Sequence, residues 1–209
     1  MLALKRFQEW REVGVRLFVA VEVPGDVQEK LGAVRRSSRD LAWRWVAQEN
    51  VHLTVKFLGE VSEGLVSRIG EVLTDVCAPI APFELGLAGL GTLPPWRPDS
   101  EDERRLRKPL RVLYADLERG RPELRSLVHG VEEATASLGF DRERRLFTPH
   151  ATLARVRKEQ RPRDAAEILD RFSGELFGVW RCDGAVLFQS ELAPGGARYT
   201  RLGEFPFEV

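Results

Sequence analysis

Residues 51–59 have the sequence VHLTVKFLG, and residues 147–155 have the sequence FTPHATLAR. Each stretch holds the triplet His-x-Thr, starting at His52 and at His150. The pattern around them predicts β-strands at residues 51–59 and 146–155. The triplet thus occurs once in each half of the chain. This repetition predicts two similar lobes that each contribute one strand to a common cleft.

The predicted strands decide which side chains share a face, because successive side chains of a strand point to opposite sides of a sheet. The polar faces then hold His52 with Thr54 and Lys56 on the first strand, and His150 with Thr148 and Thr152 on the second. The opposite faces are apolar, with Val51, Leu53, Val55 and Phe57 on the first strand and Phe147, Ala151 and Leu153 on the second. Each histidine therefore has hydroxyl groups beside it.

Two histidines that face one cleft suit acid–base chemistry at phosphorus. An imidazole titrates at a pH of about 6.5, so one ring can accept a proton while the other donates one. A displacement at phosphorus needs both acts, and a threonine hydroxyl can donate to a phosphate oxygen as charge builds up. The alternative is that the two triplets arose by chance and that each histidine is an ordinary surface or core residue.

The sequence does not support other catalytic or metal sites. The third histidine, His129, lies on the polar face of a predicted helix, and we expect it to be solvated. A zinc hydrolase would need His129 as a ligand, but the chain has no HExxH, and no carboxylate stands at ligand spacing from His52 or His150. Walker A and Gly-x-Ser-x-Gly patterns are absent, and Gly89 and Gly91 lack the third glycine of a dinucleotide-binding loop. We therefore expect neither a metal nor a cofactor.

Basic residues gather around the second motif. Residues 142–163 carry eight of them against two glutamates, in a chain whose 32 basic and 32 acidic residues cancel overall. Such a run is often only a solvated face, but beside a histidine strand it favours an approach path for a polyphosphate. The candidate substrate-binding cations are Arg155, Arg157 and Lys158, at and beyond the end of the strand. Lys56 and Thr148 are further candidate substrate-binding residues.

The composition limits the class of protein. The chain has 209 residues, 43% of them hydrophobic, which suits one domain or two small lobes. The two cysteines, Cys77 and Cys182, form no CxxC pair and no disulfide framework. No apolar run reaches the ~18–20 residues needed to cross a bilayer, and the charged N-terminus does not resemble a signal peptide. We expect a cytoplasmic protein with no membrane partner, and the sequence does not indicate an oligomeric state.

Strand and helix patterns alternate along the rest of the chain. Strands are predicted at residues 16–23, 43–46, 83–93, 110–117 and 179–190, the last with a hairpin partner at 197–207 after a turn at Pro194. Helices are predicted at residues 24–39, 62–76, 122–138 and 164–172. Residues 94–109, which are almost wholly proline and charge, are predicted to form an exposed loop. We expect residues 1–14 to be an N-terminal extension of a single domain that spans 15–209.

The two motif stretches resemble those of the two-histidine phosphodiesterase superfamily. RLFVAVEVP at 16–24, FELGLAGLGTLP at 83–94 and VLFQSELAPGGARYTRLGEFPF at 186–207 extend the resemblance over nearly the whole chain. Within the superfamily the chain is most similar to RNA 2′,3′-cyclic phosphodiesterases, also called 2′-5′ RNA ligases. The resemblance implies an α+β fold of two pseudo-symmetric lobes of antiparallel sheet, with helices outside and the active-site cleft between the lobes.

The resemblance also implies roles for the motif residues. His52 would be the proton donor and His150 the proton acceptor, with Thr54 and Thr152 completing the two motifs. The substrate would be RNA that ends in a 2′,3′-cyclic phosphate, which is opened to a 2′-phosphate without metal; tRNA fragments are one candidate source. The same chemistry run in reverse would form a 2′-5′ bond without ATP.

Two other functions remain open. The basic residues could serve a non-catalytic RNA-binding module, or the site could belong to a related cyclic-nucleotide phosphodiesterase. A binding module does not require two His-x-Thr triplets, so the sequence favours an enzyme.

Overall fold

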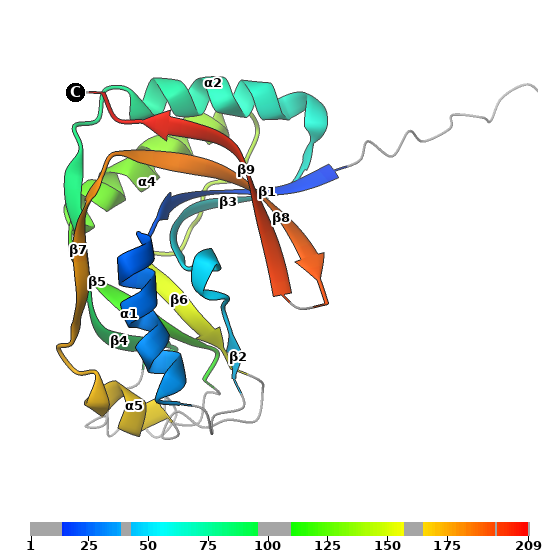
Figure 1. Cartoon of the computed structure of the whole chain (residues 1–209). Coiled ribbons are helices and arrows are strands. Elements are labelled where there is room, and N and C mark those ends of the chain that lie inside the picture. Colours follow the sequence, from blue (N-terminus) through cyan, green and yellow to red (C-terminus); the bar gives the residue numbers. More distant parts are fainter. Residues whose placement is uncertain (1–13, 39–42, 96–109, 157–164, 195, 209) are drawn as a thin grey trace, which may run out of the picture.

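The computed structural model describes residues 14–38, 43–95, 110–156, 165–194 and 196–208, and Figure 1 shows the arrangement of their helices and strands. The strands are β1 (Gly14–Glu22), β2 (Arg44–Trp45), β3 (His52–Ser62), β4 (Phe83–Leu93), β5 (Val112–Arg119), β6 (His150–Arg155), β7 (Leu176–Cys182), β8 (Gly184–Ala193) and β9 (Gly196–Pro206). The helices are α1 (Gly25–Arg36), α2 (Val66–Cys77), α4 (Arg121–Ala136) and α5 (Ala166–Arg171), with short 3₁₀ turns η1 (Gln48–Asn50) and η2 (Glu63–Leu65).

All strands join one curled antiparallel sheet, which is organised as two matching halves. The order is β7-β4-β5-β6-β3-β1-β8-β9, and β2 pairs with β6 outside this path. Each half is therefore a motif strand followed by three more strands, and the halves meet where β6 pairs with β3. The α+β fold with two lobes of antiparallel sheet is confirmed, and the lobes are the two halves of this sheet.

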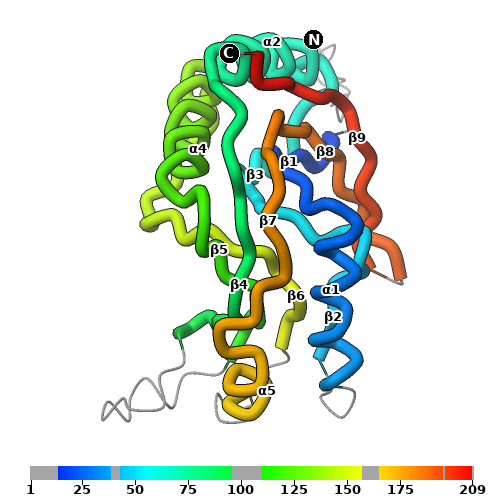
Figure 2. The backbone as a smooth tube through the Cα atoms, turned by 60° about the vertical axis from the view of Figure 1, so that its left-hand side comes forward, coloured from blue at the N-terminus to red at the C-terminus, as the bar shows by residue number. Residues whose placement is uncertain are grey.

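The helices pack on the apolar face of the sheet. Helix α4 contacts α2 and β3, and α1 contacts β7, as Figure 2 also shows for the last pair. In α4 the buried residues recur at helical spacing, at Leu124, Leu127, Val128 and Val131, which is the pattern of an amphipathic helix. Burial of this apolar face holds the helices against the strands that carry the two motifs.

Strand β1 is buried on both faces, because it lies between two apolar clusters. Leu17, Val19 and Val21 belong to the large core under the helices. Phe18 and Ala20, which alternate with them, belong to a smaller cluster with Val186, Phe188 and Tyr199. The smaller cluster lies on the opposite face of the sheet from the helices, because side chains alternate along a strand.

The structure corrects some boundaries that the sequence predicted. The strand predicted at 146–155 begins only at His150, because Pro149 has no N–H with which to extend the ladder. The stretch 179–190 is two strands, since Asp183 separates β7 in one lobe from β8 in the other. Helix α2 begins at Val66 rather than at Ser62, which is the last residue of β3.

Other predicted segments agree with the structure or lie outside it. The strand at 83–93 and the hairpin of β8 with β9 are confirmed. Residues 1–13 of the predicted extension and residues 96–109 of the predicted loop lie outside the described residues. In the ranges that the structure describes, no helix combines the length and the apolar character that crossing a membrane requires.

Candidate active site

The two motif strands meet at the triplets themselves. Leu53 of β3 pairs with Ala151 of β6 in antiparallel register. Continued by one residue in each direction, this register sets His52 opposite Thr152 and sets Thr54 opposite His150. Cross-strand partners lie on the same face of a sheet, so the register predicts that the four motif side chains gather on the face opposite the helices.

A backbone carbonyl orients each histidine ring. The Nδ1 of His52 donates to the carbonyl oxygen of Asn50 at 2.8 Å, and the Nδ1 of His150 donates to that of Thr148 at 2.7 Å. A carbonyl oxygen can only accept, so Nδ1 carries the hydrogen and Nε2 becomes the reactive atom of each neutral ring. The Nε2 of His52 accepts from the Thr54 hydroxyl at 3.0 Å. The two lobes thus hold their histidines in the same way.

The environment of His52 favours its neutral form in the free protein. Burial lowers the pKa of His52 below 6.5, the hydrogen bond to Asn50 raises it, and the positive charges of His150 and Arg155 lower it further. The influence of His150 means that the two rings lie close enough for their charges to interact. A bound anion between the rings would oppose the lowering by these positive charges.

Aromatic rings contact both histidines. The ring centroid of Phe18 lies 4.9 Å from that of His52, and the ring of Tyr199 lies 5.5 Å from it. Tyr114 of β5 lies 5.0 Å from His150. The chain has two tyrosines in all, so each of them contacts one motif histidine. Sequence reasoning missed these rings, because strand pairing between distant segments brings them to the site.

Phe57 does not lie on the apolar face that the alternation of the first strand predicted. Its side chain is 61% exposed, and its ring lies 5.9 Å from that of Phe18, on the face that carries His52. The cause is a register shift in β3, where Ala20 pairs with Thr54 but Val19 pairs with Lys56. Val55 is the extra residue of this β-bulge, and such an insertion reverses the faces of the residues that directly follow it, Lys56 and Phe57.

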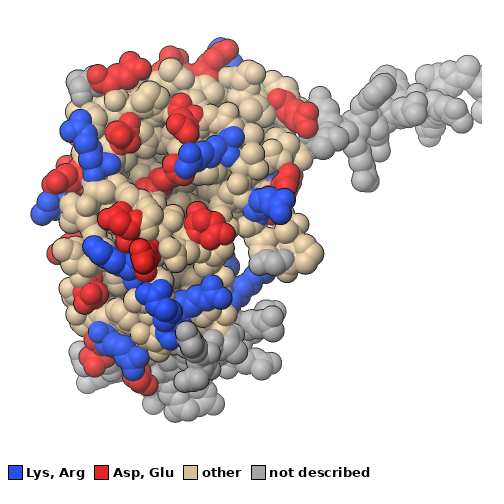
Figure 3. Space-filling view, in the orientation of Figure 1, with Lys and Arg blue, Asp and Glu red and all other residues tan. Residues whose placement is uncertain are grey.

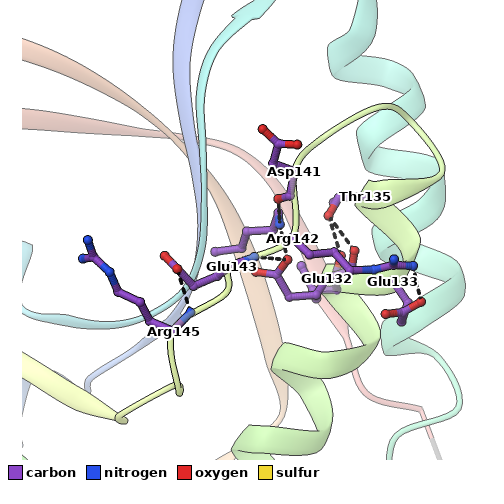
Figure 4. Close-up of polar contacts among 9 residues, drawn as sticks. Glu132, Glu133, Thr135, Asp141, Arg142, Glu143 and Arg145 are labelled. Atoms are coloured by element: carbon purple, nitrogen blue, oxygen red, sulfur yellow. Dashed lines mark hydrogen bonds and ion pairs between the residues drawn. The ribbon is translucent and has the colours of Figure 1, made fainter.

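The same bulge makes the prediction for Lys56 wrong. Lys56 is 5% exposed and faces helix α4 rather than sharing the face of His52. Its Nζ forms an ion pair with Glu132 of α4 and donates to the carbonyl oxygen of Asp141 at 2.9 Å. Figure 4 shows Glu132 and Asp141 in the polar cluster that joins α4 to the segment before β6. Lys56 therefore belongs to the interior and not to a substrate-binding surface.

Of the other predicted site residues, the structure describes Thr148 and Arg155, which lie at the two ends of the second motif. Thr148 is exposed and contributes the carbonyl oxygen that orients His150. Arg155 ends β6. Burial raises the pKa of Tyr199 and lowers that of His52, and the positive charge of Arg155 acts on both groups, opposing the rise at Tyr199 and adding to the lowering at His52. Arg155 is therefore near the His52 side of the site. Arg157 and Lys158 lie outside the described residues. His129 is exposed on α4, as predicted.

Asn50 is a further residue that sequence reasoning missed. Its carbonyl oxygen orients His52, and its side-chain Nδ2 donates to the carbonyl oxygen of Ala197 in β9 at 2.7 Å. The equivalent position before His150 is Thr148, which plays the same part through its carbonyl oxygen. The shared spacing of two residues before each histidine could have pointed to Asn50.

Charged groups elsewhere on the described surface do not form a metal site. On the face shown in Figure 3, acidic and basic side chains are mixed over the upper part, and basic side chains gather in the lower part. Among the described residues, no three His, Cys, Asp or Glu side chains are grouped so that they could hold a metal ion.

A cavity of about 280 Å³ lies behind the motif strands, away from the histidines. Its lining includes Leu31 of α1, Trp45 of β2, and Val51 and Leu153, which alternate with the motif residues. None of the motif histidines and threonines lines this cavity, so the candidate active site is the opposite face of the two strands.

Known proteins are similar to this chain in sequence and in fold over most of its length. Residues 21–100 and 116–199 match the family described as LigT like Phosphoesterase. A protein of Archaeoglobus fulgidus named RNA 2′,3′-cyclic phosphodiesterase is 35% identical, over 91% of this chain and 99% of its own. A protein of Thermus thermophilus with the same name is 34% identical, over 91% of this chain and 89% of its own.

Solved structures agree with these relatives. The crystal structure of E. coli LigT complexed with 3′-AMP has a TM-score of 0.72 at 26% identity and covers 94% of this chain and 99% of that one. The crystal structure of TT0787 of Thermus thermophilus has a TM-score of 0.73 at 29% identity and covers 92% of this chain and 98% of that one. The family that the sequence resembles is thereby confirmed. Since the matched ranges include both His-x-Thr strands and most of the chain, this protein belongs to the LigT-like phosphoesterase family.

Proposed function

We propose that this protein hydrolyses 2′,3′-cyclic phosphate ends of RNA to 2′-phosphomonoesters, with His52 and His150 as its acid–base pair. The observation that carries the proposal is the pairing of the motif strands at Leu53 and Ala151, with the Nδ1 of each histidine engaged by a carbonyl oxygen. This arrangement leaves two Nε2 atoms for one phosphate. The names of the relatives support the choice of substrate.

In the proposed reaction a water oxygen attacks phosphorus and loses a proton to the Nε2 of His150. The bond between phosphorus and the 3′-oxygen breaks, and the Nε2 of His52 gives its proton to that oxygen. The products are a 2′-phosphate and a 3′-hydroxyl. Thr54 and Thr152 donate to the non-bridging oxygens, where a well-placed donor contributes roughly 10²–10³ in rate.

The proton on His52 has to come with the substrate. Burial and neighbouring positive charges lower the pKa of His52 in the free protein. At neutral pH, His52 would then lack the proton that the proposed step requires it to donate. A cyclic phosphate carries a negative charge, and its position between the two rings would raise the pKa of His52. We therefore infer that the anion and the proton on His52 bind together.

The rest of an RNA substrate would contact the margins of the site. Arg155, with Arg157 and Lys158 beyond it in the sequence, would bind flanking phosphates. The exposed ring of Phe57 offers a face on which a base could stack, and such stacking is worth about 1–3 kcal/mol per base. tRNA fragments are one source of such ends. Run in reverse, the same steps would join a 5′-hydroxyl end to a cyclic phosphate through a 2′-5′ bond.

The test is hydrolysis of 2′,3′-cyclic AMP and of an oligonucleotide with a cyclic phosphate end, in the presence of EDTA, followed by ³¹P NMR. We expect a 2′-phosphate product without added metal. His52→Ala and His150→Ala should each lower kcat by about 10²–10⁴-fold, and the double variant should lose less than the product of the two factors. His129→Ala is the control and should retain activity.

Each alternative gives a different result in this test. A non-catalytic RNA-binding module would bind the oligonucleotide and release no product. Loss of activity with EDTA and its return with zinc would indicate a metallohydrolase. If kcat/KM for 2′,3′-cyclic AMP equals the value for the oligonucleotide, the result would favour a phosphodiesterase for free cyclic nucleotides over one for RNA.

A further inference from the structure

The ring of His150 needs two constraints before its Nε2 can point reliably at a phosphate. The χ2 torsion of histidine has a broad energy minimum, so the ring can swing unless something holds it. One constraint is the hydrogen bond from Nδ1 to the carbonyl oxygen of Thr148, at 2.7 Å. This bond fixes one atom of the ring but leaves the tilt of the ring about that contact open.

Tyr114 supplies a contact that can fix the tilt. It lies on β5, its Cα pairs with that of Thr152 on β6, and it is 9% exposed. Its ring centroid is 5.0 Å from that of His150, with an angle of 53° between the planes. Such a tilted pair is within the favourable range for two aromatic rings. Within the described residues, Tyr114 is the one aromatic ring that contacts His150, whereas His52 contacts both Phe18 and Tyr199.

Gly91 on the neighbouring strand makes room for the Tyr114 ring. The two residues pair between β4 and β5. A Cβ at position 91 would lie 2.4 Å from the Cζ and 2.5 Å from the hydroxyl oxygen of Tyr114, which is well inside van der Waals contact. Gly91 is not among the glycines with positive φ. Its backbone therefore does not require glycine, and the need for glycine here is the space that the ring occupies.

We propose that Gly91 and Tyr114 act as positioning residues that hold the His150 ring in its working orientation. Glycine at position 91 lets the tyrosine ring lie across β4, and that ring in turn limits the tilt of the imidazole. The proposed role needs the aromatic ring of Tyr114, whose centroid lies 5.0 Å from that of His150, and does not need its hydroxyl. This inference rests on the proposed function, in which His150 takes the proton from water.

The first experiment separates positioning from stability. A misplacement of about 1 Å can cost about 100-fold in rate, so Tyr114→Ala should lower kcat about 10- to 100-fold and leave KM for 2′,3′-cyclic AMP nearly unchanged. Tyr114→Phe, which keeps the ring, should restore kcat to within a few-fold of wild type. Leu117→Ala is the matched control, because Leu117 is buried and lies on the opposite face of the same strand. Assayed well below its melting temperature, this variant should keep the kcat of the wild type.

A second experiment tests the link between position 91 and the ring. Gly91→Ala should lower kcat in the wild-type background, because its methyl group displaces the Tyr114 ring. It should have no further effect in the Tyr114→Ala background, where no ring remains to be displaced. Gly14→Ala is the control glycine, since its Cβ would meet only ordinary contacts, the nearest at 3.6 Å.

The results distinguish this inference from the proposed function. The ¹⁵N NMR signals of the His150 ring should broaden in Tyr114→Ala and stay sharp in Tyr114→Phe and Leu117→Ala. If His150→Ala is inactive but Tyr114→Ala is fully active, the positioning role is wrong and the proposed function stands. If His150→Ala keeps its activity, the proposed function itself is wrong. An equal effect of Gly91→Ala in both backgrounds would overturn the link between Gly91 and Tyr114.

Discussion

Leu53 and Ala151 pair with each other at the point where the strands of His52 and His150 meet. Both are buried in the core beneath the site, and each immediately follows a motif histidine in the sequence. The distance between the two strands at this pair therefore controls the distance between the two imidazoles. The small side chain of Ala151 lets β6 lie close to the core residues beneath it.

Replacement of Ala151 by leucine should move His52 and His150, the proposed acid and base, apart. Overpacking of a buried site typically costs about 1–3 kcal/mol of stability, and we expect kcat to fall about 100-fold as well, because the rings move relative to one phosphate. Ala185→Leu on β8 is the control, since Ala185 is equally buried but remote from the pair. Urea unfolding and steady-state kinetics on both variants would test this. Equal kcat values for the two variants would mean that the strand pair does not set the geometry.

The stability of the protein should fall in mild acid because of His52. Burial, together with the charges of His150 and Arg155, lowers its pKa in the folded protein below 6.5. The unfolded chain then binds a proton at higher pH than the folded protein does, so unfolding is favoured as the pH falls from about 6.5 toward the lower pKa of the folded state. We expect the free energy of unfolding, measured by urea titration, to decline less steeply over this window in His52→Asn. The same slope in both proteins would contradict the assignment.

Lys56→Met should destabilise the protein without a direct effect on substrate binding. Removal of one partner from a buried ion pair typically costs about 3–5 kcal/mol. Among the described residues, the carboxylate of Glu132 would then keep its bond from the backbone N–H of Glu143, at 3.2 Å, without a basic partner. The double variant Lys56→Met with Glu132→Leu should recover much of the loss, because no charge then remains unpaired. A raised KM with unchanged stability would instead restore Lys56 to the substrate-binding surface.

Arg157 and Lys158 should affect long substrates more than short ones. Their replacement by glutamine should raise KM for an oligonucleotide and leave KM for 2′,3′-cyclic AMP nearly unchanged, because the mononucleotide has no flanking phosphates. Binding to a single strand changes with salt at a slope of about −0.7 per phosphate contact. Loss of two contacts should therefore flatten the plot of log Kd against log salt by about 1.4. An unchanged slope would mean that both side chains are only solvated.

The local patterns of the sequence predict the strands and the motif faces correctly up to the point where the backbone departs from regular geometry. The alternation places His52 and Thr54 together, and their hydrogen bond agrees with this. The prediction fails from Lys56 onward, because the bulge at Val55 depends on how β3 pairs with β1. No pattern within β3 alone encodes that pairing.

The aromatic neighbours of the histidines could not be predicted for a related reason. Tyr114 reaches the site because β5 pairs with β6, and Tyr199 reaches it because the β8–β9 hairpin joins the sheet where β8 pairs with the distant β1. Their own strands contain no motif. Repetition of a motif indicates the candidate reactive residues. The residues that hold them in place are determined by register, which emerges only when the whole sheet assembles.

The chain does not keep its two lobes apart. β2 precedes the first motif strand yet pairs with β6 of the other lobe, and α1 crosses to pack on β7. One apolar core draws on β1 and β3 as well as on β4, β5 and β6. The lobes are therefore interlaced rather than docked, and an excised segment 83–182 would lose an edge partner and a covering helix at once. The separation of the two imidazoles therefore depends on packing that both lobes share, so a change in the core of one lobe should reach the histidine of the other.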